Sequence, residues 1–110
     1  MHVKKREDVQ PYVAPKHHGM TAFRLQGQEA TPTQGMWVGY SIFLPGGGAE
    51  TSASPIEKVY VVLEGEITVV TRDRTVTLTA MDSCLIEANE ERSVENRGKD
   101  VAKMLVISPK

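Results

Sequence analysis

Residues 46–65 read GGGAETSASPIEKVYVVLEG, a stretch in which glycines frame a regular spacing of polar residues. The spacing is Gly46-x5-Ser52-x-Ser54-x3-Lys58-x6-Gly65. A second stretch further along the chain has the spacing Met81-x5-Glu87-x-Asn89-x2-Arg92-x3-Asn96. The residues between the two stretches, 66–80, fit a single β-hairpin. The chain therefore contains two motifs of fixed spacing that are joined by one hairpin.

These two spacings resemble those of the cupin superfamily, whose patterns read G-x5-H-x-H-x3-E-x6-G and G-x5-P-x-G-x2-H-x3-N. The resemblance covers roughly residues 36–107 and includes Pro45-Gly46, the run 60–66 and Asn96-Arg97-Gly98. It is typical of the small cupins with one conserved barrel. It implies an all-β fold, the cupin double-stranded β-helix, which is a jelly-roll barrel.

The four positions at which metal-binding cupins carry His, His, Glu and His hold Ser52, Ser54, Lys58 and Arg92. Serine hydroxyls are poor ligands for transition metals, and ammonium and guanidinium groups repel a dication. We therefore expect no metal at these positions and no other cofactor. The second motif also departs from the pattern at its Gly, Pro and Gly positions, which hold Met81, Glu87 and Asn89.

Short apolar runs separated by turn signals fill the chain from residue 21 onward, as in a sandwich or barrel. The expected strands are 21–26, 36–44, 59–64, 66–72, 75–79, 83–87, 92–96 and 101–107. The run Pro45–Gly48 is expected to form a flexible hairpin turn. Residues 1–20 have little periodicity, so we expect an irregular N-terminal arm, followed by one barrel domain over residues 21–110.

Alternation along the strands places two cations inside the barrel, because Arg92 shares a face with Val94 and Lys58 with Tyr60. Unpaired buried charges are costly, so these cations need compensation. One hypothesis is a salt-bridged plug, with Glu50, Glu57 or Glu87 as the partner. The other is an anion-binding pocket whose candidate residues are Lys58, Arg92, Ser52, Ser54 and Tyr60.

The favoured function is a metal-free cupin that binds a small, anionic metabolite, such as a carboxylate, in its barrel. A metal-independent isomerase or cyclase is a second hypothesis, in which Arg92 would lower the pKa of Lys58. All three histidines, His2, His17 and His18, lie in the arm and none lies on a barrel strand, which counts against such an enzyme. An arm can fold over the mouth of a barrel, so the sequence leaves open whether His17 or His18 reaches it and joins a metal site there. A structural or regulatory dimer is a third hypothesis, and a metal-dependent dioxygenase is the least favoured one. No catalytic residue is assigned.

Composition limits the possible partners. The net charge of −1 argues against a nucleic-acid partner. No apolar stretch approaches the roughly 20 residues that span a bilayer, so no membrane partner is expected. The N-terminus has no signal-peptide core, so a cytoplasmic location is the default expectation. The single Cys84 lies in an apolar run and is expected to be a buried, inert thiol. Residues 58–64 are apolar on both faces, which favours a homodimer.

Overall fold

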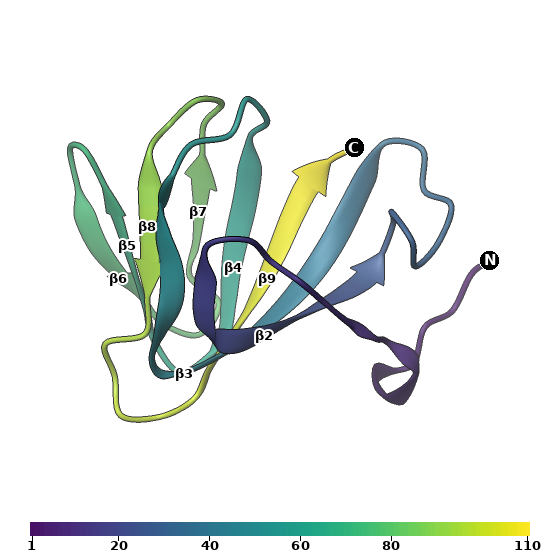
Figure 1. The fold of residues 1–110 in the computed structure, drawn as a ribbon, viewed down its shortest axis with the longest axis horizontal. Coiled ribbons are helices and arrows are strands. Elements are labelled where there is room, and N and C mark those ends of the chain that lie inside the picture. The colour runs from purple at the N-terminus through teal and green to yellow at the C-terminus, as the bar shows by residue number, and fades with distance from the viewer.

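The computed structural model describes residues 1–110 as one curled sheet of nine strands (Figure 1). The strands are β1 Pro11–Tyr12, β2 His17–Gln26, β3 Met36–Ser52, β4 Lys58–Glu64, β5 Ile67–Thr71, β6 Thr75–Leu78, β7 Ser83–Ile86, β8 Arg92–Glu95 and β9 Ala102–Pro109. A single 3-10 turn, η1, spans Arg6–Asp8, and no helix has the length and apolar character needed to cross a membrane. The predicted all-β jelly-roll barrel is therefore confirmed.

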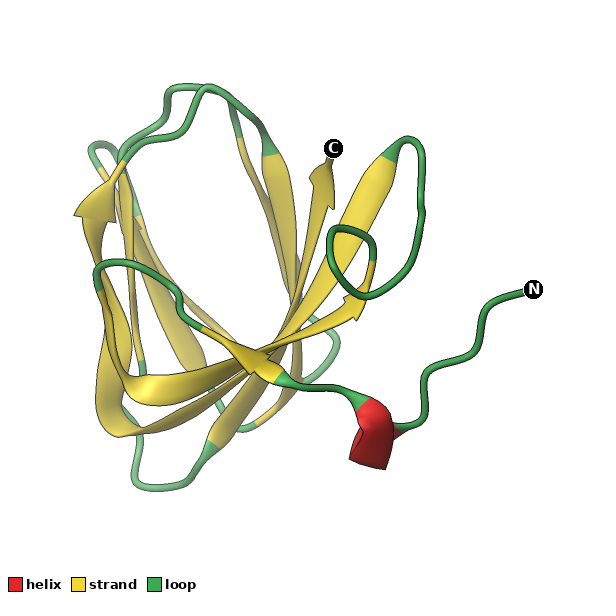
Figure 2. Cartoon of the chain, turned by 45° about the vertical axis from the view of Figure 1, so that its right-hand side comes forward, coloured by secondary structure: helices red, strands yellow, loops and turns green.

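The long strand β3 organises the barrel, because it contacts three other strands. Residues 36–43 of β3 pair with β9, and residues 48–52 pair with β8. Strand β2 pairs along the other edge of β3. From β3 one branch of the sheet continues through β9 and β4 to β7, and the other continues through β8 and β5 to β6. The two branches curl toward each other and form a cup-shaped barrel (Figure 2).

The glycine run that predicted a hairpin turn is instead part of β3. A Cβ atom on Gly48 would lie 2.2 Å from the carbonyl oxygen of Val94 in β8. A Cβ atom on Gly47 would lie 2.0 Å from the carbonyl oxygen of Gly19 in β2. These glycines therefore allow three strands to approach closely at a bend, which is the other common use of glycine in a sheet.

The second motif retains left-handed backbone conformations although it lacks glycine at those positions. Met81 has φ 69° and Asn89 has φ 66°. These are the positions that carry glycine in the cupin pattern. The left-handed region costs a residue with a Cβ atom roughly 1–2 kcal/mol, less for asparagine. The loops before β7 and β8 therefore hold left-handed residues at the expense of local strain.

The irregular arm is shorter than the predicted residues 1–20, because β2 begins at His17 and β1 pairs with it. The turn between β1 and β2, residues 13–16, is held to β3 by a hydrogen bond of 2.9 Å from the Glu50 amide to the Lys16 carbonyl. Residues 1–5 extend away from the barrel (Figure 1), whereas Arg6 stacks over the Phe23 ring of β2 and Val9 is buried. The consequence for the site is that residues 13–16 lie against the barrel.

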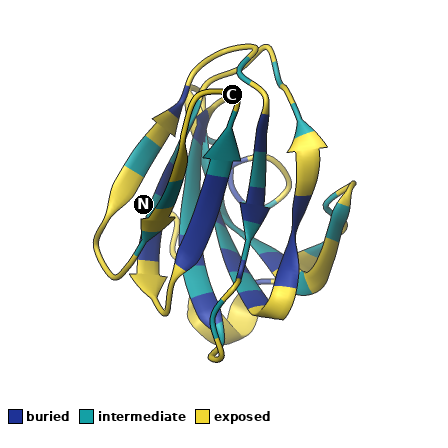
Figure 3. Cartoon of the chain, turned by 90° about the vertical axis from the view of Figure 1, so that its left-hand side faces the viewer, coloured by how far each residue is buried: buried dark blue, intermediate teal, exposed yellow.

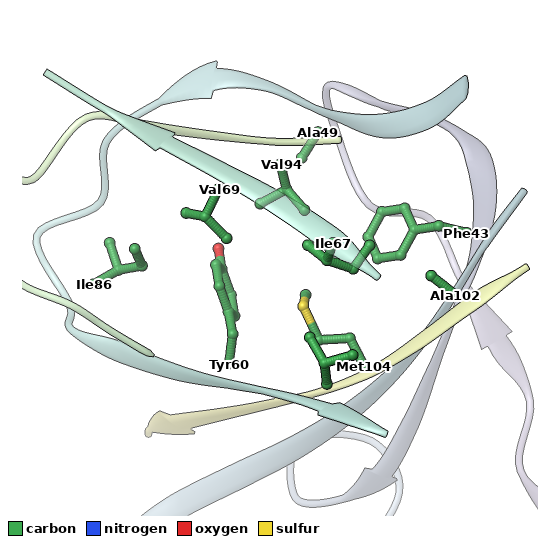
Figure 4. Close-up of a cluster of buried hydrophobic side chains, with 10 residues drawn as sticks. Phe43, Ala49, Tyr60, Ile67, Val69, Ile86, Val94, Ala102 and Met104 are labelled. Carbon is green, nitrogen blue, oxygen red and sulfur yellow. The ribbon is translucent and has the colours of Figure 1, made fainter. Parts of the chain in front are cut away.

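The core lies where the inward faces of the two branches meet. Buried positions alternate along the strands (Figure 3), as expected for a sheet with one face inside. The core side chains point toward one another from both branches (Figure 4). They are Phe43, Ala49, Tyr60, Val62, Ile67, Val69, Ile86, Val94, Ala102 and Met104.

Asn96 closes the base of this core. Its side chain is 1% exposed and donates hydrogen bonds to the carbonyl oxygens of Phe43, at 3.1 Å, and Asp100, at 2.8 Å. The side-chain oxygen of Asn96, Oδ1, accepts a hydrogen bond of 3.0 Å from the Gly98 amide. The asparagine at the end of the second motif is therefore satisfied on both sides of its amide.

Candidate functional site

A cavity of about 290 Å³ lies inside the barrel, next to the core. Its walls come from strands β2, β3, β4, β8 and β9 and from the turn at residues 13–16. The titratable side chains that line it are Tyr12, His17, Arg24, Lys58, Tyr60 and Arg92. No aspartate or glutamate lines the cavity. Its ionisable groups are therefore cationic or neutral.

Arg92 is the most deeply buried charge in the cavity. Strand β8 places its side chain inward, beside Val94, as the alternation predicted, and the residue is 8% exposed. Its Nε donates a hydrogen bond of 2.7 Å to the hydroxyl of Tyr60. Its Nη1 donates to the hydroxyl and the carbonyl oxygen of Ser52. Nη2 has no partner within the chain and is free to donate to a ligand.

Lys58 lines the same cavity from strand β4 and is half buried. Burial, and then the positive charge of Arg92, lower the pKa of Lys58. The ion pairs of the chain involve Arg24, Arg97 and Lys103, and none involves Lys58 or Arg92. The salt-bridged plug is therefore wrong, because Glu50, Glu57 and Glu87 form no ion pair with either cation.

Tyr60 and Ser52 supply hydroxyl groups beside Arg92. Both oxygens accept hydrogen bonds from the guanidinium group, so their own hydrogens are free to donate. Burial raises the pKa of Tyr60, which keeps the phenol protonated as a donor. Ser54 lies elsewhere: its hydroxyl accepts a hydrogen bond of 3.1 Å from the Ile56 amide, and it does not line the cavity. Three of the five predicted ligand-binding residues, Lys58, Tyr60 and Arg92, therefore line the cavity, and Ser52 joins them only through its hydrogen bonds to Arg92.

His17 lines the cavity, a question that the sequence left open because the expected boundary placed it in an irregular arm. Its Nδ1 lies 2.7 Å from the carbonyl oxygen of Pro15, which makes Nδ1 the protonated nitrogen of the neutral ring. Burial lowers the pKa of His17, as do the charges of Arg92 and Lys58, while the Pro15 contact opposes them. His18 faces the other way and lines a separate outer groove.

The cavity wall formed by β1, β2 and β3 carries a stacked cation. The guanidinium carbon of Arg24 lies 3.9 Å from the ring centre of Tyr12 and 4.4 Å from that of Trp37. Its Nε lies 3.4 Å from a carboxylate oxygen of Glu29. Arg24 is therefore compensated by two aromatic rings and a carboxylate, unlike Arg92.

The residues at the family's metal position do not fit a divalent cation. The Ser52 hydroxyl is bonded to Arg92, and both long side chains carry positive charge. No three His, Cys, Asp or Glu side chains lie close enough together to hold a metal ion.

Cys84 is partly exposed and not fully buried as predicted, and burial raises the pKa of its thiol.

Comparison with known proteins identifies similar chains. The family described as "Cupin domain" matches residues 39–108. A protein of Mycobacterium tuberculosis named "Beta-D-galactosidase Rv1717" is 44% identical over 95 residues, which cover 86% of this chain and 82% of that protein.

Solved structures share the fold at low sequence identity. The polyketide cyclase RemF of Streptomyces resistomycificus has a TM-score of 0.87 at 20% identity, over 99% of this chain and 79% of that one. An RmlC-like cupin of Shewanella frigidimarina has a TM-score of 0.82 at 16% identity, over 99% and 90%. A predicted oxalate decarboxylase of Thermotoga maritima has a TM-score of 0.82 at 20% identity, over 99% and 98%. At these identities the likeness concerns the fold alone.

Proposed function

Because this chain belongs to the cupin family, we propose that it binds a small, anionic metabolite in its barrel and does so without a metal. The anion would lie between Lys58 and Arg92, where other cupins place a dication. A carboxylate suits this position, because guanidinium and ammonium groups both donate strongly to it. The cavity of about 290 Å³ has the size of a small-molecule site.

The observation that carries this proposal is a buried guanidinium group without an acidic partner. Arg92 is 8% exposed, and its protein partners, Tyr60 and Ser52, are neutral. Lys58 adds a second positive charge to the same cavity. A buried charge that lacks a counterion is strongly destabilising. An anionic ligand would offset this cost, and that explains why the chain retains both cations.

Thermal unfolding in the presence of carboxylates and inorganic phosphate tests the proposal. We expect at least one of these anions to raise the Tm of the protein, and to raise it less in Lys58→Met and Arg92→Met variants. The matched control is Arg72→Gln, because Arg72 is exposed and lies outside the cavity. If no anion shifts the Tm, or if the cavity variants respond like the control, the proposal is wrong.

Hydrolysis of a β-galactoside is a second candidate function, supported by the relative that is 44% identical and carries that name. Most glycosidases use a pair of carboxylic acids around the bond that they cleave. The cavity offers none, so Tyr60 and His17 would have to move the protons. The same two groups, with Lys58, would serve a metal-independent isomerase or cyclase.

Release of a chromophore from an aryl β-galactoside tests this second candidate. Turnover that is lost in both Tyr60→Phe and His17→Gln, and retained in His18→Gln, would support hydrolysis in the barrel. Turnover that survives both cavity substitutions would place the activity elsewhere. No turnover at all would leave the binding function as the better description of the chain.

A further inference from the structure

Apart from two groups of charges, one with Arg92 and Lys58 and one with Arg24, the cavity lining is mostly apolar. Of the 18 residues that line the cavity, 12 are hydrophobic. The apolar lining from the strands includes Met20, Ala22, Phe43, Val94, Met104 and Val106, and Ser41 is the one serine in the lining. A hydroxyl group placed against most of this surface would lose its hydrogen bonds to water and gain none, which is unfavourable.

The two charged walls also differ in whether their cations are compensated. On one wall Arg92 and Lys58 have no acidic partner. On the other wall Arg24 is stacked between Tyr12 and Trp37 and is paired with Glu29. A second anionic group at the Arg24 wall would have to compete with Glu29. The cavity therefore favours one negative charge, at the Arg92 end.

We infer that the ligand is a monocarboxylate with an apolar body, not a dicarboxylate and not a sugar acid. The carboxylate would accept hydrogen bonds from Arg92, Lys58 and the Tyr60 hydroxyl, and the body would lie against the apolar wall with its far end near Trp37 and Tyr12. This inference rests on the proposed anion site, and it adds the chemical class of the ligand to that site.

Trp37 allows a direct test, because it is the single tryptophan of the chain and lines the cavity. Its fluorescence is titrated with phenylacetate, glutarate and galacturonate at one pH and one ionic strength, and calorimetry checks each Kd. We expect phenylacetate to bind at least roughly tenfold more tightly than the other two acids, since only its body buries apolar surface.

Three variants locate the binding. Arg92→Met is expected to abolish binding of all three acids. Val106→Thr keeps the volume of the side chain but adds a hydroxyl, so it is expected to weaken the binding of phenylacetate severalfold. Acetate, which has no apolar body, is titrated as a fourth acid and is expected to bind this variant and the parent protein equally. Arg72→Gln, which removes an exposed arginine outside the cavity, is expected to bind like the parent protein. Circular dichroism confirms that each variant is folded.

The outcomes distinguish the proposed anion site from the inference about the class of its ligand. If glutarate or galacturonate binds as tightly as phenylacetate and Arg92→Met abolishes that binding, the anion site stands and the inference about its ligand is wrong. The inference also fails if phenylacetate binds more tightly but Val106→Thr has no effect on it. If none of the acids binds, or if Arg92→Met binds them normally, the proposed function fails and the inference fails with it.

Discussion

The residues at the family's metal position differ in charge from the ligands that metal-binding cupins carry there. Ser52, Lys58 and Arg92 keep their places in the barrel frame, and two of them bring positive charge into the cavity. The backbone does not need to change for this to happen. Because Lys58 and Arg92 stand where metal-binding cupins carry a carboxylate and an imidazole, the local charge has the opposite sign, and this reversal is the basis of the anion site that we propose.

The charge of His17 should make anion binding depend on pH. Burial, Arg92, Lys58 and His18 lower the pKa of His17, so the ring is neutral near pH 7 in the free protein. A bound anion would raise that pKa. Affinity for phenylacetate should therefore rise as the pH falls, roughly threefold to tenfold between about pH 8 and about pH 6. Fluorescence titration of Trp37 at each pH measures the Kd of phenylacetate.

The variant His17→Gln should lose this rise, and His18→Gln, which alters the neighbour in the outer groove, should largely keep it. Affinity should fall again at alkaline pH, because the pKa of Lys58 is lowered and the side chain loses its charge early. An affinity that does not rise from about pH 8 to about pH 6 would contradict the role of His17, and one that does not fall at alkaline pH would contradict the role of Lys58.

Met81 provides a prediction about stability. Its φ of 69° is unfavourable for a side chain with a Cβ atom, and the residue is 76% exposed, so few contacts would be lost on replacement. Met81→Gly should increase the free energy of unfolding by about 1 kcal/mol, measured by urea denaturation. Met81→Ala keeps the Cβ atom and should show no gain. A glycine variant that is less stable than the alanine variant would contradict this account.

At the scale of elements, the bend of β3 depends on glycines that only the sheet context explains. A run of three glycines predicts a turn, yet here it holds β2, β3 and β8 together. The local sequence was misleading because the requirement comes from backbone atoms of other strands. Strand β2 was likewise longer than predicted, because its first residues pair with the far half of β3.

Gly48→Ala tests the close packing of β3 against β8. The added Cβ atom would lie 2.2 Å from a backbone oxygen, which cannot move without breaking the strand pairing. We expect a loss of about 2 kcal/mol or more in the free energy of unfolding. Gly35→Ala is the matched control, because nothing lies within 4 Å of its added Cβ atom. Equal stability of the two variants would show that β3 and β8 can separate at no cost.

At the scale of the whole molecule, one outer face of the barrel remains apolar. Two rows of paired residues cross β3, β9, β4 and β7 on that face. They are Val38, Ile107, Val59 and Leu85 in one row, and Tyr40, Leu105, Val61 and Ser83 in the other. Leu85 is 51% exposed, and Arg6 stacks over Tyr40. A largely apolar face of this kind is suited to an identical face, and for this reason the homodimer stays our prediction.

Light scattering after size-exclusion chromatography tests that prediction. The parent protein should elute with twice the chain mass of 12.1 kDa. Leu105→Glu, in the middle of the face, should shift the population to monomer, because a buried interface does not tolerate unpaired charge. Thr75→Glu places the same charge on the exposed strand β6 and should leave the mass unchanged. A monomeric parent protein would rule the dimer out.

Local pattern predicted eight of the strands and the inward direction of Lys58 and Arg92, through the alternation of residues. The choice of a barrel over a sandwich came from the resemblance of the motif spacing to that of cupins. The alternation works because a strand has a period of two, so a residue's face depends only on its neighbours in the chain. The prediction of an anion-binding site came from the same two side chains.

The remaining facts depend on which distant segments meet. Three features of the site depend on contacts between separate strands and turns. They are the absence of an acidic partner for Lys58 and Arg92, the entry of His17 into the cavity, and the packing of Arg24 against Glu29 and two aromatic rings. Spacing along the chain carries no information about such meetings. These contacts form only when β1, β2 and the turn before His17 pack against the barrel. The tertiary structure therefore decided between the two hypotheses for the cations, a salt-bridged plug and an open pocket, in favour of the pocket.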